Sequence, residues 1–187
     1  LVPEGSVVEW EHHAVLRPVR GQVLGYAWPS QMPLELHIDG LVVHPDGRRT
    51  IIEGKTVYSE EPAVLLAPYV TQVALYQLYV ERVLGATADV TLVIEHVPRG
   101  EVRVAHLAPE TFTQPAPWTG RLSVRAWAMA RACSIAAAVG LGDLTAAPGI
   151  LDESAGMAWM CYSCRVPQCP HHRQHRQDNH RHYHYPG

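Results

Sequence analysis

The sequence lacks the features that place a protein in a membrane or in a secretory pathway. No uninterrupted run of apolar residues within the 187 residues reaches the length that spans a bilayer. The first residues, LVPEGSVVEWEHH, contain no basic segment followed by an apolar segment and a cleavage site. We therefore expect a soluble, cytoplasmic protein that has no membrane partner.

The sequence also lacks an excess of positive charge, and its cysteines are not distributed along the chain. Lys and Arg number 15 against 18 Asp and Glu, which excludes a uniformly basic surface for nucleic acid. A local groove stays compatible with this balance, because clefts focus electric field whatever the net charge. Three of the 4 cysteines crowd into residues 161–169, too close together for a distributed disulfide framework. This clustering favours a metal or cluster site in a reducing compartment.

What the sequence does contain is an alternation of strand-like and helix-like segments. Its apolar patterns predict strands at residues 7–16, 33–43, 49–57, 88–97 and 101–107, and helices at 68–84 and 122–139. This order indicates an α/β fold with a mixed central β-sheet flanked by helices. We expect a core domain over residues 1–156, a Cys-rich segment over 157–170, and a disordered His/Arg-rich tail over 171–187.

Two carboxylates stand out in the predicted hairpin of residues 37–56. The turn around Pro45-Asp46-Gly47 brings Asp39 on one strand close to Glu53 and Lys55 on the next. Two acids, with the carbonyl oxygen of Gly54, suit a hard cation such as Mg²⁺ or Mn²⁺ that leaves positions open for water and phosphate. Lys55 would then stabilise charge developing on the phosphate. Taken alone, an acid and a lysine on an exposed strand are more often a solvated pair.

The predicted helix after this hairpin carries two polar side chains on one face. Gln72 and Tyr76 are four residues apart and therefore share a side of the helix. Next to an acidic sheet edge they could bind a phosphate or a substrate strand. Either residue alone fits equally well with a core helix that has a polar stripe.

The series Asp39, Glu53-Gly54-Lys55 and Gln72-Val-Ala-Leu-Tyr76 resembles the D, (D/E)xK and QxxxY motifs of the PD-(D/E)xK nucleases, RecB-like branch. The resemblance covers roughly residues 7–107. It implies a restriction-endonuclease-like core and a Mg²⁺- or Mn²⁺-dependent deoxyribonuclease. By the same resemblance Asp39 and Glu53 are metal ligands, Lys55 is the catalytic lysine, and Gln72 and Tyr76 are accessory site residues.

A second motif lies in the Cys-rich segment. Cys161-x2-Cys164-x4-Cys169 is a ligand array that suits either an iron-sulfur cluster or zinc, with His171 or His172 completing a zinc site. Together with the nuclease series it resembles the CRISPR-associated and viral RecB-like exonucleases, which carry a C-terminal [4Fe-4S] cluster. This resemblance favours an exonuclease, with a restriction-type endonuclease, which would be expected to lack the Cys cluster, as the closest competitor. It also implies DNA and other nucleic-acid-processing proteins as partners, in DNA repair, phage recombination or CRISPR adaptation.

The sequence departs from that family at its start. The family has an N-terminal helical region with a further Cys ligand and a metal-binding His, whereas no Cys precedes Cys133 here. Either the chain as given lacks that region, or Cys133 is the fourth cluster ligand and a strand histidine serves the metal. His37 is the nearest such histidine, two residues from Asp39. A second function class also stays open: a catalytically silent nuclease-like module that binds DNA or protein through a structural zinc or iron-sulfur site.

Overall fold

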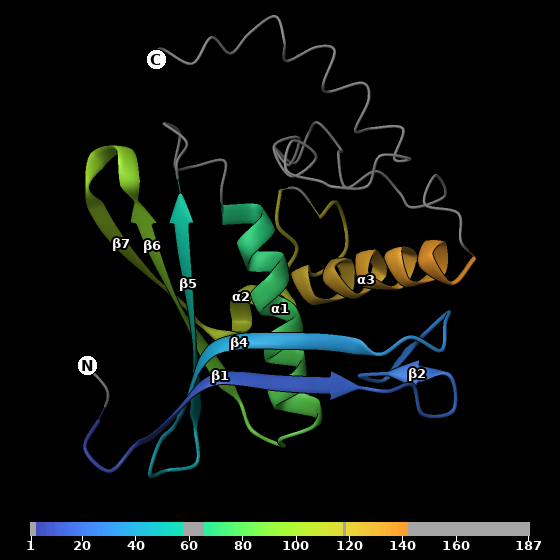
Figure 1. The fold of residues 1–187 in the computed structure, drawn as a ribbon, viewed down its shortest axis with the longest axis horizontal. Coiled ribbons are helices and arrows are strands. Elements are labelled where there is room, and N and C mark those ends of the chain that lie inside the picture. Colours follow the sequence, from blue (N-terminus) through green and yellow to red (C-terminus); the bar gives the residue numbers. More distant parts are fainter. Residues whose placement is uncertain (1–2, 58–65, 118, 142–187) are drawn as a thin grey trace, which may run out of the picture.

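A computed structural model describes residues 3–57, 66–117 and 119–141, and the structural statements below concern these residues. Their main feature is a five-stranded sheet in the order β1-β4-β5-β6-β7. Its strands are β1 (Val7–Leu16), β4 (Leu34–Val43), β5 (Arg49–Val57), β6 (Ala88–His96) and β7 (Glu101–Leu107). A second, two-stranded sheet pairs β2 (Gln22–Val23) with β3 (Tyr26–Ala27). Figure 1 shows β1 and β4 running side by side, across the direction of β5, β6 and β7.

The sheet is mixed because one of its connections is a helical crossover. β4 and β5 form an antiparallel hairpin, in which Gly47 has a φ of 84° and Oδ1 of Asp46 accepts a hydrogen bond from the backbone N–H of Arg48. α1 (Leu66–Arg82) then carries the chain to β6, which pairs parallel to β5. β7 returns antiparallel to β6 after the short 3₁₀ helix η2 (Val97–Arg99). The expected α/β fold with a mixed sheet flanked by helices is confirmed.

α1 lies on one face of the sheet and makes the centre of the core. It contacts β4, β5 and β6, and α3 (Val124–Leu141) packs against its other side (Figure 1). α2 (Pro109–Thr113) packs against α3 and β6, and its Phe112 is fully buried. The core combines the inward residues of the strands with the apolar face of α1, and its members include Leu36, Ile38, Ile51, Val73, Ala74, Leu78, Val90 and Leu92.

α3 is long and apolar enough to span a membrane by length and composition alone. The sequence shows no uninterrupted apolar run there because Arg125 and Arg131 divide it. In this fold α3 packs against α1 and α2 with Ala128 and Met129 buried, while 28% of the helix is buried in all. Arg125 is held by the side chains of Glu81 and Gln77 on α1, at 2.7 and 2.8 Å.

Gly40 determines how closely β1 approaches the middle of β4. A Cβ atom at Gly40 would lie 3.0 Å from the ring of Trp10, which is tighter than side chains normally pack. In chain order Gly40 is the first residue of β4 that pairs with β5, and it stands opposite Ile52. Beyond this pair, towards the start of β4, the two strands separate. The residue next to Gly40 at this point is Asp39.

Candidate functional site

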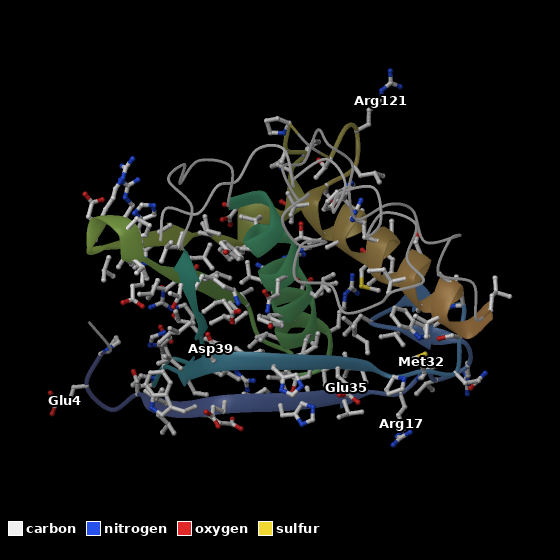
Figure 2. The ribbon with its side chains drawn as sticks, turned by 45° about the horizontal axis from the view of Figure 1, so that its top comes forward. Glu4, Arg17, Met32, Glu35, Asp39 and Arg121 are labelled. Carbon is white, nitrogen blue, oxygen red and sulfur yellow. The ribbon has the colours of Figure 1, made fainter. Side chains whose placement is uncertain are left out.

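Asp39 lies where β4 separates from β5. The backbone N–H of Gly54 donates a 2.7 Å hydrogen bond to Oδ2 of Asp39. The Asp39 carboxylate therefore accepts the hydrogen bond that a backbone carbonyl of β4 would accept in a continuous ladder. It links β4 to β5 at the fork, the point where the two strands separate. Its side chain is otherwise exposed, and Figure 2 labels it near the crossing of β4 and β5.

Glu53 and Lys55 occupy the face of β5 that is turned towards α1. Strand alternation places them on the same side as the buried Ile51, and Glu53 is only 1% exposed. Lys55 Nζ forms an ion pair with Oε1 of Glu53, whereas Oε2 is buried without a hydrogen-bond partner in the described part of the chain. Burial raises the pKa of Glu53 and is the largest influence; Lys55 lowers it, the charge of Asp39 raises it, and a hydrogen bond from the Asp39 backbone lowers it. The site thus contains a buried carboxylate with one oxygen held by Lys55 and the other without a partner among the described residues.

α1 presents three polar or aromatic side chains to this pair. Gln72 Nε2 donates a hydrogen bond to Oη of Tyr76, and that hydroxyl donates to the backbone carbonyl of His37 on β4. Tyr69, one helical turn before Gln72, lies with its ring centre 5.7 Å from Nζ of Lys55. The helix therefore fixes both the backbone beside Asp39 and the lysine beside Glu53.

Tyr76 stays protonated in this environment. Burial raises its pKa to about 12, and the nearby charges of Glu53 and Asp39 act in the same direction. A phenol with such a pKa keeps its proton and donates a hydrogen bond to the His37 carbonyl rather than acting as a base.

The structure thus brings together the five side chains that the sequence singled out: Asp39, Glu53, Lys55, Gln72 and Tyr76. Tyr69 belongs with them and was missed. Its signal was available, because Tyr69, Gln72 and Tyr76 recur at helical spacing on one face. It was overlooked because an aromatic residue in the first turns of an apolar helix is ordinarily a core residue.

The predicted cluster ligands are only partly described. Cys133 lies on α3, half-buried, and its thiol donates to the backbone carbonyl of Ala27 at 3.3 Å. Burial raises the pKa of this thiol. Cys161, Cys164 and Cys169 fall outside the described residues, as does the tail at 171–187.

No protein-family model and no curated protein matches the chain. Among solved structures, the chain is similar to the crystal structure of SSO0001, with 14% sequence identity and a TM-score of 0.43. The match covers 84% of this chain and 57% of that one, so this chain spans little more than half of its length. At these values the likeness assigns neither a family nor a function.

Proposed function

We propose that the protein is a metal-dependent DNA nuclease of the PD-(D/E)xK superfamily, RecB-like branch, with a restriction-endonuclease-like core. The observation that carries the proposal is the convergence of Asp39, Glu53 and Lys55 at the fork between β4 and β5. A solvated pair on a strand face would not explain why Glu53 is buried with one oxygen that has no partner in residues 3–57, 66–117 and 119–141. Lys55 pairs with one oxygen of this carboxylate, and a bound metal cation would offset the cost of burying the other.

The side chains present fit a hard divalent cation. Oε2 of Glu53 is free of hydrogen bonds in the described structure, and the exposed carboxylate of Asp39 accepts a hydrogen bond from the backbone of Gly54, the residue after Glu53. Mg²⁺ or Mn²⁺ would be held by these two acids and by the carbonyl oxygen of Gly54, since both ions prefer oxygen ligands. Such an ion, when bound, supplies Lewis acidity and a more acidic water.

The protein's own residues supply position and charge for hydrolysis. A water oxygen forms a bond to phosphorus, the bond to the leaving oxygen breaks, and that oxygen takes up a proton, without a covalent enzyme intermediate. Lys55 places a positive charge where negative charge develops on the phosphoryl oxygens. Gln72 offers an amide to the substrate backbone, while Tyr76 anchors the β4 backbone beside Asp39. The resemblance of the motifs favours an exonuclease over an endonuclease.

Lys55 allows a sharp test, because it is the only lysine in the sequence. The full chain, purified without oxygen, is incubated with end-labelled single-stranded and duplex DNA and with Mg²⁺ or Mn²⁺. We expect Lys55→Ala to lower the cleavage rate about 10²-fold or more, as the loss of one electrostatic stabiliser does. Arg48→Ala, which removes an exposed cation from the β4–β5 turn, is the matched control and should cleave normally. Equal cleavage by wild type and Lys55→Ala would refute the site.

Chemical modification gives the same test without a mutation. Acetylation of lysine removes the charge of Nζ, whereas reductive methylation keeps it. We expect cleavage to fall in proportion to acetylated Lys55 and to survive methylation better. The Lys55→Arg variant reports any effect of modifying the α-amino group, because it has no lysine left to react.

One observation favours a second function. Lys55 already occupies Oε1 of Glu53, and in a catalytically silent module this ion pair would simply fill the fork. Such a module would bind DNA or a partner protein without cutting it. The experiment above separates the two functions, since a silent module retains DNA in a gel-shift assay but shows no metal-dependent cleavage in the wild type.

The Cys-rich segment enters the proposal on sequence grounds alone. We propose that Cys161, Cys164 and Cys169 bind a [4Fe-4S] cluster, with Cys133 as the candidate fourth ligand in this chain. A structural Zn²⁺ is the alternative. Iron, sulfide and zinc analysis of the anaerobically purified chain distinguishes them, and Cys133→Ser should lower the iron content only if Cys133 is a ligand.

A further inference from the structure

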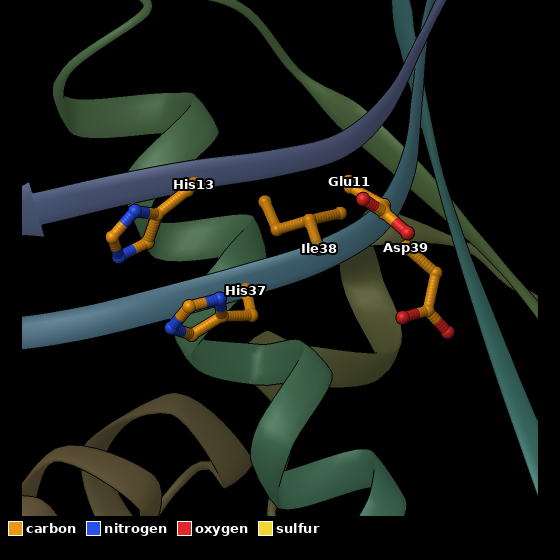
Figure 3. Close-up of a pocket in the computed structure, with 5 residues that line it drawn as sticks. All are labelled: Glu11, His13, His37, Ile38 and Asp39. Carbon is orange, nitrogen blue, oxygen red and sulfur yellow. The ribbon is translucent and has the colours of Figure 1, made fainter.

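A group of potential metal ligands lies on the outer face of β1 and β4, apart from Glu53 and Lys55. His13, Glu35 and His37 each offer a ligand atom, and these atoms all lie within 4.8 Å of one another. His13 Nε2 is 3.9 Å from Oε2 of Glu35, and the rings of His13 and His37 stack with centroids 4.2 Å apart. Figure 3 shows the two imidazole rings side by side on the neighbouring strands.

The strand pairing brings these residues together and keeps them together. His13 stands directly opposite His37 in the antiparallel ladder, so both side chains point to the same face. Glu35 is two residues from His37 along β4 and shares that face. The intervening Leu36 points the other way and is buried in the core. The backbone therefore places all three residues on one face before any ligand binds.

We propose that His13, Glu35 and His37 form a binding site for a transition-metal dication of the Zn²⁺ class, distinct from the proposed Mg²⁺ or Mn²⁺ site. Two imidazoles and one carboxylate form a ligand set that suits Zn²⁺, and three protein ligands leave a coordination position for water. Metal bonds of about 2.0 Å separate neighbouring ligand atoms by about 3.3 Å in a tetrahedral site. Small side-chain rotations close the observed spacing to that value, because all three groups are exposed.

The surroundings suit such an ion. A cavity of about 330 Å³ is lined by Glu11, His13, His37, Ile38 and Asp39, so the open coordination position would face a hollow that has room for water. The pairing of β1 with β4 has a gap at Glu11, whose φ is 54°, and at Asp39 opposite it. The ion would clamp the edge strand β1 onto β4 close to this gap. A positive centre would thereby stand two residues from Asp39 on the same strand.

The test must locate the ion, because the chain contains 12 histidines and 4 cysteines that can also bind transition metals. The full ¹⁵N-labelled chain is titrated with substoichiometric Cu²⁺, a paramagnetic probe of imidazole sites that broadens nearby amide signals. We expect selective broadening of two amide signals. The first is Ala14, which follows His13, and the second is Leu36, which lies between Glu35 and His37. A Zn²⁺ titration should compete with Cu²⁺ and restore these signals.

Matched variants make the result decisive. His13→Ala/His37→Ala should abolish broadening at Ala14 and Leu36 while leaving any broadening elsewhere in the chain. Glu35→Gln should weaken the local affinity about tenfold or more. His106→Ala, which removes an exposed histidine from β7, should change nothing at these amides. The proposal is overturned if wild-type Ala14 and Leu36 keep their signals, or if their broadening persists in the double variant.

Discussion

Replacing Glu53 with glutamine should change how stability depends on pH in a predictable direction. Glu53 is the only acidic side chain that is buried in the described part of the chain. Glutamine keeps its shape and an oxygen that still accepts a hydrogen bond from Lys55, so the substitution removes mainly the negative charge. The folded-state pKa of Glu53 is raised from 4.5, first because the group is buried and also because Asp39 is close.

The sign follows from proton linkage. Below about pH 4.5, Glu53 is protonated in both the folded and the unfolded chain, and its pKa shift contributes in full to stability. As the pH rises towards the folded-state pKa, the unfolded chain loses the proton first, so the folded state becomes less stable. A single group can lower the free energy of unfolding by at most about 1.4 kcal/mol per pH unit in this window. Above the folded-state pKa the loss levels off.

Urea denaturation followed by tryptophan fluorescence, between pH 4 and pH 8, measures this effect. We expect the free energy of unfolding of the wild type, minus that of Glu53→Gln, to fall across the window, because contributions from histidines cancel in the difference. Mg²⁺ favours ionised Glu53, so it should reduce the fall in the wild type alone. Parallel pH profiles for the two proteins would refute the inference that burial raises the pKa of Glu53 in the folded state.

Two further substitutions test how the fork is built. Gly40→Ala places a methyl group 3.0 Å from the Trp10 ring and should cost about 1–3 kcal/mol of unfolding free energy. The loss should shrink in a Trp10→Ala background, and simple additivity of the two losses would contradict the packing argument. Tyr76→Phe removes the hydroxyl that donates to the His37 carbonyl and should cost about 1 kcal/mol, measured by thermal denaturation. An unchanged melting temperature would mean that this hydrogen bond does not stabilise the fold.

Much of the sheet could be predicted because side-chain alternation is a local property of the sequence. The predicted strand at residues 49–57 coincides with β5, and that at 101–107 coincides with β7. The β2–β3 hairpin was missed because its turn uses Leu24 and Gly25, both with positive φ. Leucine rarely adopts that conformation, so its presence gave no turn signal. α2 was missed because five residues are too few to show a helical period.

One part of the candidate site likewise follows from local sequence, and another part depends on how distant elements pack. The hairpin between β4 and β5 is local, so the proximity of Asp39, Glu53 and Lys55 follows from the position of one turn. The stacking of His13 on His37 depends on the register between β1 and β4, which are separated along the chain by the β2–β3 hairpin. No local pattern sets that register. The unpartnered oxygen of Glu53 is likewise a product of how α1 packs on the sheet, which the sequence pattern alone cannot specify.

The candidate nuclease site is drawn from one unbroken stretch of sequence, from Asp39 on β4 to Tyr76 on α1. β6, β7 and α3 support this stretch without contributing any of the residues placed in the site. A circular permutation that opens the chain between β6 and β7, where η2 is exposed, would therefore leave the whole constellation on one continuous segment. The candidate site is in that sense local in sequence: one segment carries all of its residues, while β6 and α3 provide the surfaces against which that segment packs.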